Sequence, residues 1–117
     1  VGITIGAVAE AIILCEKAGT DPEKMIKALT GGWADSKILQ THGQRMIKKD
    51  FSPKGKTSTQ LKDMGNILDC AKELNLHLPI STLVKEMYNS LVNNGHGNKD
   101  HSSLYKEIEG VNKKWNY

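Results

Sequence analysis

The histidine and cysteine side chains are the residues of this 117-residue chain whose types most readily suggest chemistry. These residues are His42, His77, His96, His101, Cys15 and Cys70. Their positions in the sequence lack the paired spacings that are typical of zinc sites. His96 and His101 lie close together, but a Gly-rich turn separates them, which favours a solvated loop. No nucleophile lies in a recognisable strand-turn-helix elbow. The sequence therefore predicts no metal site, and it leaves a Ser/His/Asp or Cys/His arrangement open.

Composition and charge narrow the class of protein further. The chain is 38% hydrophobic and 25% charged, which is typical of one soluble domain. Its net charge is only +3, Arg45 is its single arginine, and its lysines alternate with acidic residues. A nucleic-acid surface needs a denser basic stripe, so no nucleic-acid partner is expected. No GxGxxG motif follows a strand, so the chain itself has no dinucleotide-binding unit.

The first fifteen residues, VGITIGAVAEAIILC, are almost continuously apolar. They lack a preceding basic region, contain Glu10 and are too short to span a bilayer, so no membrane association is expected. A helix that is apolar on nearly every side is typically buried on every side. Val1 at the head of such a helix suggests that the chain was cut from a longer one. Cys15 and Cys70 lie in apolar helical patterns, as buried free thiols do, which favours a reduced, cytoplasmic protein.

The positions of caps and apolar residues predict helices throughout the chain. Asp21-Pro22 begins one helix, Gly31-Gly32 ends it, and Asp35 or Ser36 caps the next. Apolar spacings of three and four residues then recur over 38–47, 61–74, 80–92 and from about Ser102 to Trp115. Asp100 and Ser102 are expected to cap the last helix. No stretch alternates as a half-buried strand does, so we expect an all-α bundle of about six helices.

Three segments resemble motifs of the β-hydroxyacid dehydrogenase family, in the order in which that family has them. Residues 9–23, AEAIILCEKAGTDPE, resemble the end of its interdomain helix. Residues 50–64, DFSPKGKTSTQLKDM, resemble its DFxPGFxxxLxxKDL stretch, and residues 95–104, GHGNKDHSSL, resemble its GxGxxDxSAL signature. The resemblance covers essentially the whole chain. It implies that residues 1–117 are the helical C-terminal domain, similar to that of 6-phosphogluconate dehydrogenase, without the family's N-terminal Rossmann domain.

The resemblance also implies an activity for the complete protein. Members of the family transfer a hydride between NAD or NADP and a small β-hydroxy acid or semialdehyde. The loop GGWADS at residues 31–36 is most similar to the branch that reduces 2-hydroxy-3-oxopropionate, and the branch that oxidises 3-hydroxyisobutyrate is the alternative. The family's general acid/base lysine belongs to the start of the interdomain helix, upstream of Val1. The chain alone is therefore expected to be inactive.

Three residues of this chain match positions that the family uses for binding. Lys62 matches a lysine that reaches the nicotinamide end of the cofactor, although its spacing alone favours a solvated lysine. Asp63 matches an aspartate that could contact substrate or orient Lys62, and a carboxylate favoured by the helix dipole is the alternative. Trp33 follows the Gly-Gly turn, where it could line a substrate cleft between domains or anchor the turn against the bundle.

One position departs from the family pattern. Gly55 occupies the place of an aromatic residue that helps to wall the family's substrate pocket, which raises the hypothesis of a member that has lost catalysis. Lys54 or Lys56 could instead offer a cation to a more acidic substrate. A different class of function, a non-catalytic dimerisation module, is suggested by the apolar first helix, which needs more cover than five other helices can supply. A homo-oligomer is therefore expected.

Overall fold

The computed structural model describes residues 1–114, and these form helices joined by turns and loops. Trp115, which was expected on the apolar face of the last helix, lies outside the described residues. Within residues 1–114 the α-helices are α1 (Gly2–Lys17), α2 (Pro22–Leu29), α3 (Lys37–Lys48), α4 (Thr57–Glu73), α5 (Pro79–Leu91) and α6 (Leu104–Lys114). Two short turns complete them, the π-helical η1 (Val92–His96) and the 3-10 helix η2 (His101–Ser103). The all-α prediction is confirmed.

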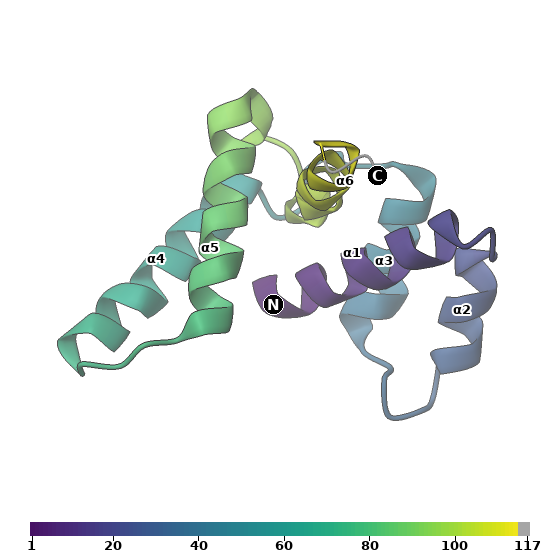
Figure 1. Ribbon diagram of the computed structural model, residues 1–117, viewed down its shortest axis with the longest axis horizontal. Helices are drawn as coiled ribbons and strands as arrows, with labels where there is room; N and C mark the ends of the chain where they lie inside the picture. Colours follow the sequence, from purple (N-terminus) through teal and green to yellow (C-terminus); the bar gives the residue numbers. More distant parts are fainter. Residues whose placement is uncertain (115–117) are drawn as a thin grey trace.

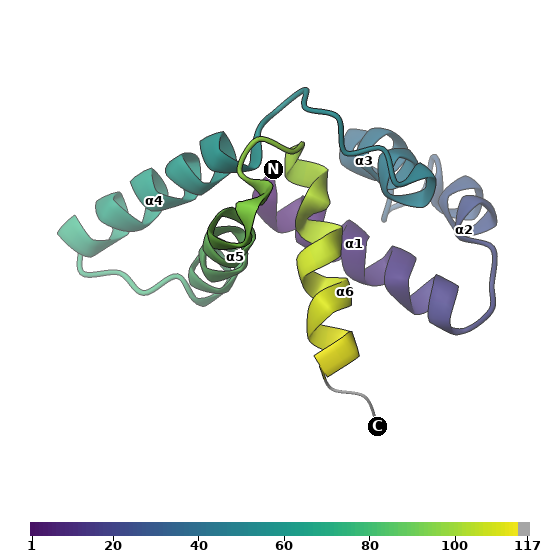
Figure 2. The same cartoon turned by 90° about the horizontal axis from the view of Figure 1, so that it is seen from above.

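Helix α1 holds the two ends of the molecule together. The α4–α5 pair lies at one end, α2 and α3 lie at the other, and α6 packs across the middle of α1 (Figures 1 and 2). The loop between α3 and α4 runs over the top from one end to the other (Figure 2). The molecule measures 43 × 31 × 31 Å along its principal axes. This loop and the start of α6 therefore meet close to the N-terminus of α1.

The predicted helix starts are confirmed. The Asp21 carboxylate accepts a hydrogen bond of 2.9 Å from the Glu23 amide, and Pro22 occupies the first turn of α2. The Ser36 hydroxyl accepts a hydrogen bond of 2.9 Å from the Leu39 amide, so Ser36 is the N-cap of α3. Each cap satisfies an amide that lacks a helical partner. Local sequence thus sets where α2 and α3 begin.

The core is built around one side of α1, and its fully covered members include Ile5 and Ile12. Tyr88 from α5, Met46 from α3 and Leu104 from α6 are also completely buried. Side chains from three other helices therefore pack against α1, which explains why α1 is so apolar. Removal of such side chains from water is the main favourable contribution to folding.

The expectation that α1 is buried on every side is wrong for this chain. Val1, Ile3 and Leu14 are 68%, 41% and 71% exposed, so a second apolar face of α1 meets solvent. The apolar side chains that recur over 80–92, in α5, are also only partly covered, because Ile80 and Leu83 are 62% and 57% exposed. The other five α-helices of residues 1–114 cover only one side of α1. Apolar periodicity identified the helices correctly, but it overestimated how much of their surface the chain covers by itself.

The two cysteines remain unpaired, and Cys70 is exposed on α4, against the expectation of a buried thiol. No helix within the described part of the chain is both long and apolar enough to cross a membrane.

Candidate functional site

Two of the family-like motifs meet in space at the start of α4. The segment around Phe51–Thr57 runs beside the segment Gly97–His101, and the two exchange backbone hydrogen bonds. The Asp100 amide donates to the Phe51 carbonyl at 2.9 Å, and the His101 amide donates to the Gly55 carbonyl at 2.7 Å. The result is a short antiparallel contact, with a single β-bridge between Lys56 and Asp100. The fold thus joins into one structure two motifs that the sequence only places in order.

Asp100 is the anchor of this contact. Its side chain is 1% exposed, and one carboxylate oxygen accepts hydrogen bonds of 3.0 Å from the amides of Lys54 and Gly55. The other oxygen accepts from the Ser102 amide at 3.0 Å and from the Ser102 hydroxyl at 2.5 Å. The predicted cap of the last helix is therefore confirmed, and the same carboxylate also clamps the loop before α4. Arg45 Nε lies 3.6 Å from this carboxylate.

The electrostatics of Asp100 follow from these bonds. Burial by itself raises the pKa of a carboxyl group, because it disfavours the charged form. The hydrogen bonds from Ser102, Gly55 and Lys54 outweigh burial and hold the pKa of Asp100 well below its usual range. The carboxylate is therefore charged at neutral pH, and the clamp is complete under those conditions.

His101 does not lie in a solvated loop, which corrects the expectation from sequence. Its imidazole is half-buried and packs over Gly55, where an added Cβ would lie 3.1 Å from ring atoms. Its Nε2 lies 3.0 Å from Nε2 of His42, and its Nδ1 lies 3.2 Å from Oε1 of Gln60. Burial lowers the pKa of both imidazoles, and the neighbouring Asp100 carboxylate only partly offsets it.

Sequence reasoning missed the pairing of His42 with His101, because 59 positions separate the two residues. The available signal was indirect: His42 lies on the apolar side of the predicted third helix. The described residues that could together hold a metal ion are His42, Asp100 and His101. The sequence prediction that no metal binds rested on local spacing and stays a prediction.

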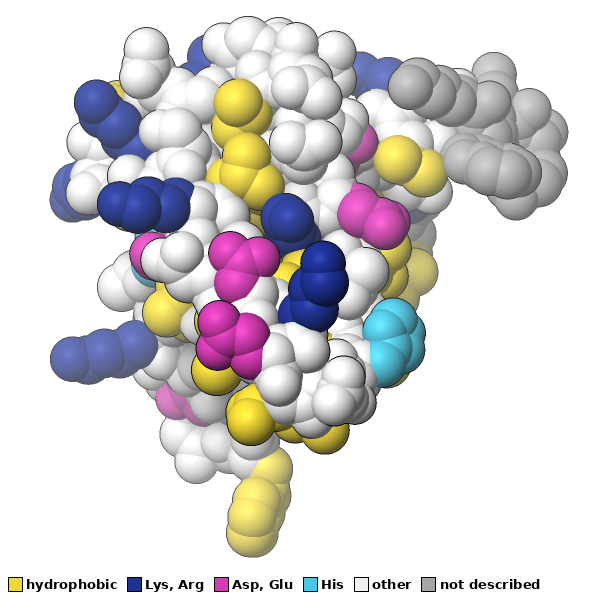
Figure 3. Space-filling model, turned by 90° about the vertical axis from the view of Figure 1, so that its left-hand side faces the viewer, with side chains coloured by type: hydrophobic (Ala, Val, Ile, Leu, Met, Phe, Trp, Pro, Cys, Tyr) yellow, Lys and Arg dark blue, Asp and Glu magenta, His cyan; other side chains and the backbone are white. Residues whose placement is uncertain are grey.

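The predicted binding residues of α4 lie on its outer surface. Lys62 and Asp63 are both exposed, in the second turn of the helix. The ion pairs among the described residues are Arg45–Asp100, Lys49–Glu16 and Lys113–Glu109, so neither Lys62 nor Asp63 has an ion-pair partner within residues 1–114. The face that α4 and α5 present carries lysines and acidic residues beside apolar side chains (Figure 3). Lys62 is therefore available to a group outside this chain.

Trp33 lies in the loop between α2 and α3, and its side chain is completely exposed. The expectation that it anchors the Gly-Gly turn against the bundle is wrong. The fold places this loop at the opposite end of the molecule from α4, so residues 1–114 do not bring Trp33 together with Lys62 (Figure 1). A role in substrate binding would need another domain or a second copy to close over it.

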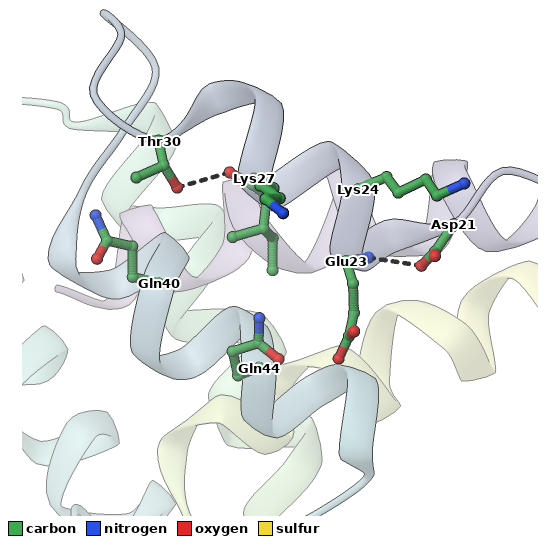
Figure 4. Close-up of a pocket in the computed structure, with 8 residues that line it drawn as sticks. Asp21, Glu23, Lys24, Lys27, Thr30, Gln40 and Gln44 are labelled. Atoms are coloured by element: carbon green, nitrogen blue, oxygen red, sulfur yellow. Dashed lines mark hydrogen bonds between the residues drawn. The ribbon is translucent and has the colours of Figure 1, made fainter.

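The groove between α2 and α3 contains none of the predicted site residues. It has a volume of about 500 Å³ and is lined mainly by polar side chains, among them Lys24, Lys27, Gln40 and Gln44 (Figure 4). Figure 4 shows these side chains spread along an open surface, without convergence on one point. The groove therefore has no arrangement that indicates a reaction.

The fold and the joined motifs together define a helical domain of a dehydrogenase. The family model described as the NAD-binding domain of NADP-dependent 3-hydroxyisobutyrate dehydrogenase matches residues 1–108, and the chain belongs to this family. It is 42% identical over 109 residues to a 2-hydroxy-3-oxopropionate reductase of Escherichia coli. The matched residues make up 93% of this chain and 37% of that protein. It is 29% identical over 110 residues to an L-threonate dehydrogenase of Cupriavidus necator, with 94% and 37% covered.

A solved structure shows the same fold. The 3-hydroxyisobutyrate dehydrogenase of Salmonella typhimurium superimposes with a TM-score of 0.84 at 30% identity, over 90% of this chain and 37% of that one. The chain therefore spans a little over a third of the length of the relatives that it matches.

Proposed function

We propose that the complete protein is an NAD- or NADP-dependent oxidoreductase of small β-hydroxy acids or semialdehydes, with 2-hydroxy-3-oxopropionate as the first candidate substrate. The observation that carries this proposal is the family match over residues 1–108, together with 42% identity to a 2-hydroxy-3-oxopropionate reductase. The similarity to a 3-hydroxyisobutyrate dehydrogenase keeps 3-hydroxyisobutyrate as the alternative substrate.

Residues 1–114 supply one side of such a site. The described residues contain no strand-turn-helix unit, so the pyrophosphate of the dinucleotide would be bound by a separate domain. When bound, the nicotinamide supplies or accepts the hydride. The general acid/base lysine would also come from outside this chain, as the family resemblance implies. The isolated chain should therefore fold without catalysing the reaction.

Lys62 is the residue of this chain that we assign to the cofactor side of the site. It is exposed on the second turn of α4 and has no ion-pair partner within residues 1–114. Its ammonium group is therefore accessible to an anionic ligand. Its ammonium group would compensate the charge of a cofactor phosphate or a substrate carboxylate. Asp63 is adjacent and would contact substrate hydroxyl groups, and Trp33 would contact substrate only when another domain or copy covers it.

Turnover by the complete protein tests this proposal. NADH or NADPH oxidation is followed at the absorbance of the reduced nicotinamide, with 2-hydroxy-3-oxopropionate and other short semialdehydes as substrates. We expect oxidation with at least one of them and none with the isolated 117-residue chain. If no semialdehyde supports oxidation of NADH or NADPH, and neither 3-hydroxyisobutyrate nor another short hydroxy acid supports reduction of NAD or NADP, the assignment is wrong.

We infer a second function, self-association, from the uncovered face of α1. Ile3 and Leu14 are exposed on that face, and a groove of about 660 Å³ between α1 and α6 continues it past Ala7 and Ala11. Exposed apolar surface that is continuous in this way is typical of a subunit interface. A second copy that presents the same face would cover both the exposed side chains of α1 and the groove between α1 and α6.

Light scattering on the 117-residue chain tests this inference. Leu14→Lys should shift the chain towards monomer, because a charge would enter the buried interface. Leu76→Lys is the matched control: Leu76 is also exposed, at 56%, but lies in the loop between α4 and α5. A chain that is monomeric without any substitution would contradict self-association.

A further inference from the structure

The contact between His42 and His101 has an unusual hydrogen-bond requirement. The Thr41 hydroxyl donates to the Lys37 carbonyl at 2.7 Å, so its oxygen can only accept from Nδ1 of His42, 3.0 Å away. His42 must therefore carry its hydrogen on Nδ1. When this imidazole is neutral, its Nε2 presents a lone pair and no hydrogen.

His101 is held in the same way from the other side. Its Nδ1 faces the carbonyl oxygen Oε1 of Gln60 at 3.2 Å, which is an acceptor and calls for a hydrogen on Nδ1. Nε2 of neutral His101 then also presents a lone pair. The two lone pairs meet across 3.0 Å, where two acceptors repel each other unless a cation lies between or beside them. A cation bound by both nitrogens would remove this repulsion.

We propose that His42 and His101 bind a divalent transition metal ion such as Zn²⁺ through their two Nε2 atoms. Imidazole nitrogen is a preferred ligand of Zn²⁺, Ni²⁺ and Co²⁺. Bonds of about 2.0–2.1 Å at angles of about 90° to 109° place two nitrogen ligands about 2.8–3.4 Å apart. The observed separation of 3.0 Å therefore accommodates an ion with little movement of either ring.

The surroundings of the two rings match those of metal-bound histidines. In such sites the second ring nitrogen donates its hydrogen to an oxygen, which fixes the ring and its tautomer. Thr41 Oγ and Gln60 Oε1 are placed to do this for His42 and His101. The two ring centroids lie 4.9 Å apart, and the ring planes are inclined by 60°.

Asp100 contributes charge to this site and does not coordinate the ion. Its two oxygens already accept four hydrogen bonds, from Lys54, Gly55 and Ser102. Its negative charge nevertheless lies beside the imidazoles and balances Arg45, whose Nε is 3.6 Å away. Two protein ligands leave the remaining coordination positions to water or to a group from elsewhere. The bound ion would tie α3 to η2.

Calorimetric titration of the 117-residue chain with ZnCl₂ tests the proposal. We expect one Zn²⁺ per chain, with binding weakened at least tenfold by His42→Gln and by His101→Gln. Glutamine can still form a hydrogen bond across the contact but is a much poorer metal ligand, so these variants should remain folded. Circular dichroism checks their helical content.

Two control variants test whether other side chains of the chain bind the zinc ion. His77→Ala and Cys70→Ser remove exposed side chains that could also bind zinc, and both should retain the wild-type affinity. Zn²⁺ should also raise the melting temperature of the wild-type chain but not of His42→Gln, because only the native pair binds the ion. Equal affinity in wild type and His42→Gln, or affinity that is lost only with His77 or Cys70, overturns the proposal. One of the two imidazoles then carries its hydrogen on Nε2, and the contact is a hydrogen bond between the two rings.

Discussion

Gly55 is explained at the scale of a single residue. The ring of His101 packs directly over its Cα, the Asp100 carboxylate accepts from its amide, and its carbonyl accepts from the His101 amide. The missing side chain is thus part of the clamp between the two motifs. The hypothesis that Gly55 marks a loss of catalysis has no support in this geometry, although activity alone can test it. A phenylalanine at this position would displace His101, so Gly55→Phe would not be a clean test.

Gly55→Ala should destabilise the chain by about 1–3 kcal/mol, because the new Cβ would lie 3.1 Å from the His101 ring. Gly65→Ala is the matched control. Gly65 lies inside α4 with open space where its Cβ would be, so the substitution should stabilise by roughly 0.5–1 kcal/mol. Urea unfolding measures both changes. Equal effects of the two substitutions would contradict the packing of His101 on Gly55.

Asp100→Asn should cost about 3 kcal/mol at neutral pH, because an amide cannot replace a buried carboxylate that accepts four hydrogen bonds. The folded-state pKa of Asp100 is lowered, so its contribution is present above the unfolded pKa of about 4 and is lost as pH falls below it. The difference in unfolding free energy between wild type and Asp100→Asn should therefore narrow from pH 7 towards about pH 3. Urea titrations at both pH values measure it, and a constant difference would show that the carboxylate charge is not what stabilises the clamp.

At the scale of the helices, the residue at which a helix begins depends on its near neighbours in the sequence. The sequence alone is therefore sufficient to predict where helices begin. Ser36→Ala should destabilise the chain by about 1 kcal/mol, because the Leu39 amide would lose its only acceptor at the start of α3. Ser36→Asp retains an acceptor and should leave the urea midpoint nearly unchanged. A loss of the same size in both variants would mean that position 36 matters for another reason.

The sequence could not predict what each helix face contacts. Asp21 and Ser36 act through neighbours within a few positions, as Asp100 does through Ser102, so these roles as caps were evident from residue type, whereas the contacts of Asp100 with Lys54 and Gly55 were not. His42 and His101 meet only because α3 and η2 pack together. The exposed side of α1 was equally invisible, because apolar periodicity reports which residues avoid water and does not report whether this chain or another molecule covers them.

The same limit applies to the candidate site. Lys62 was selected by its match to a lysine of the family motif, and the structure adds that it is exposed and lacks an ion-pair partner within residues 1–114. Trp33 was selected by its place after the Gly-Gly turn, and the fold separates it from α4. Residues 1–114 by themselves do not bring both side chains to one substrate. Trp33 and Lys62 would therefore act in one site only with help from a further domain or copy.

At the scale of the whole molecule, residues 1–114 form a helical platform with two exposed apolar regions, one on α1 and one on α5. Such a platform fits a domain that works inside a larger protein. The relatives that it matches are about two and a half times as long as this chain, and its family-like motifs lie close to the start of α1. The central claim is therefore that α4 contributes Lys62 to a cofactor site completed by the rest of the protein.

Steady-state kinetics of the complete protein with Lys62→Ala test this claim most directly. Loss of one charge-assisted contact should lower kcat/KM by roughly tenfold to a hundredfold. Lys72→Ala, which removes an exposed lysine near the other end of α4, should leave kcat/KM unchanged. If Lys62→Ala and Lys72→Ala both behave as wild type, Lys62 is a solvated lysine and α4 does not face the cofactor.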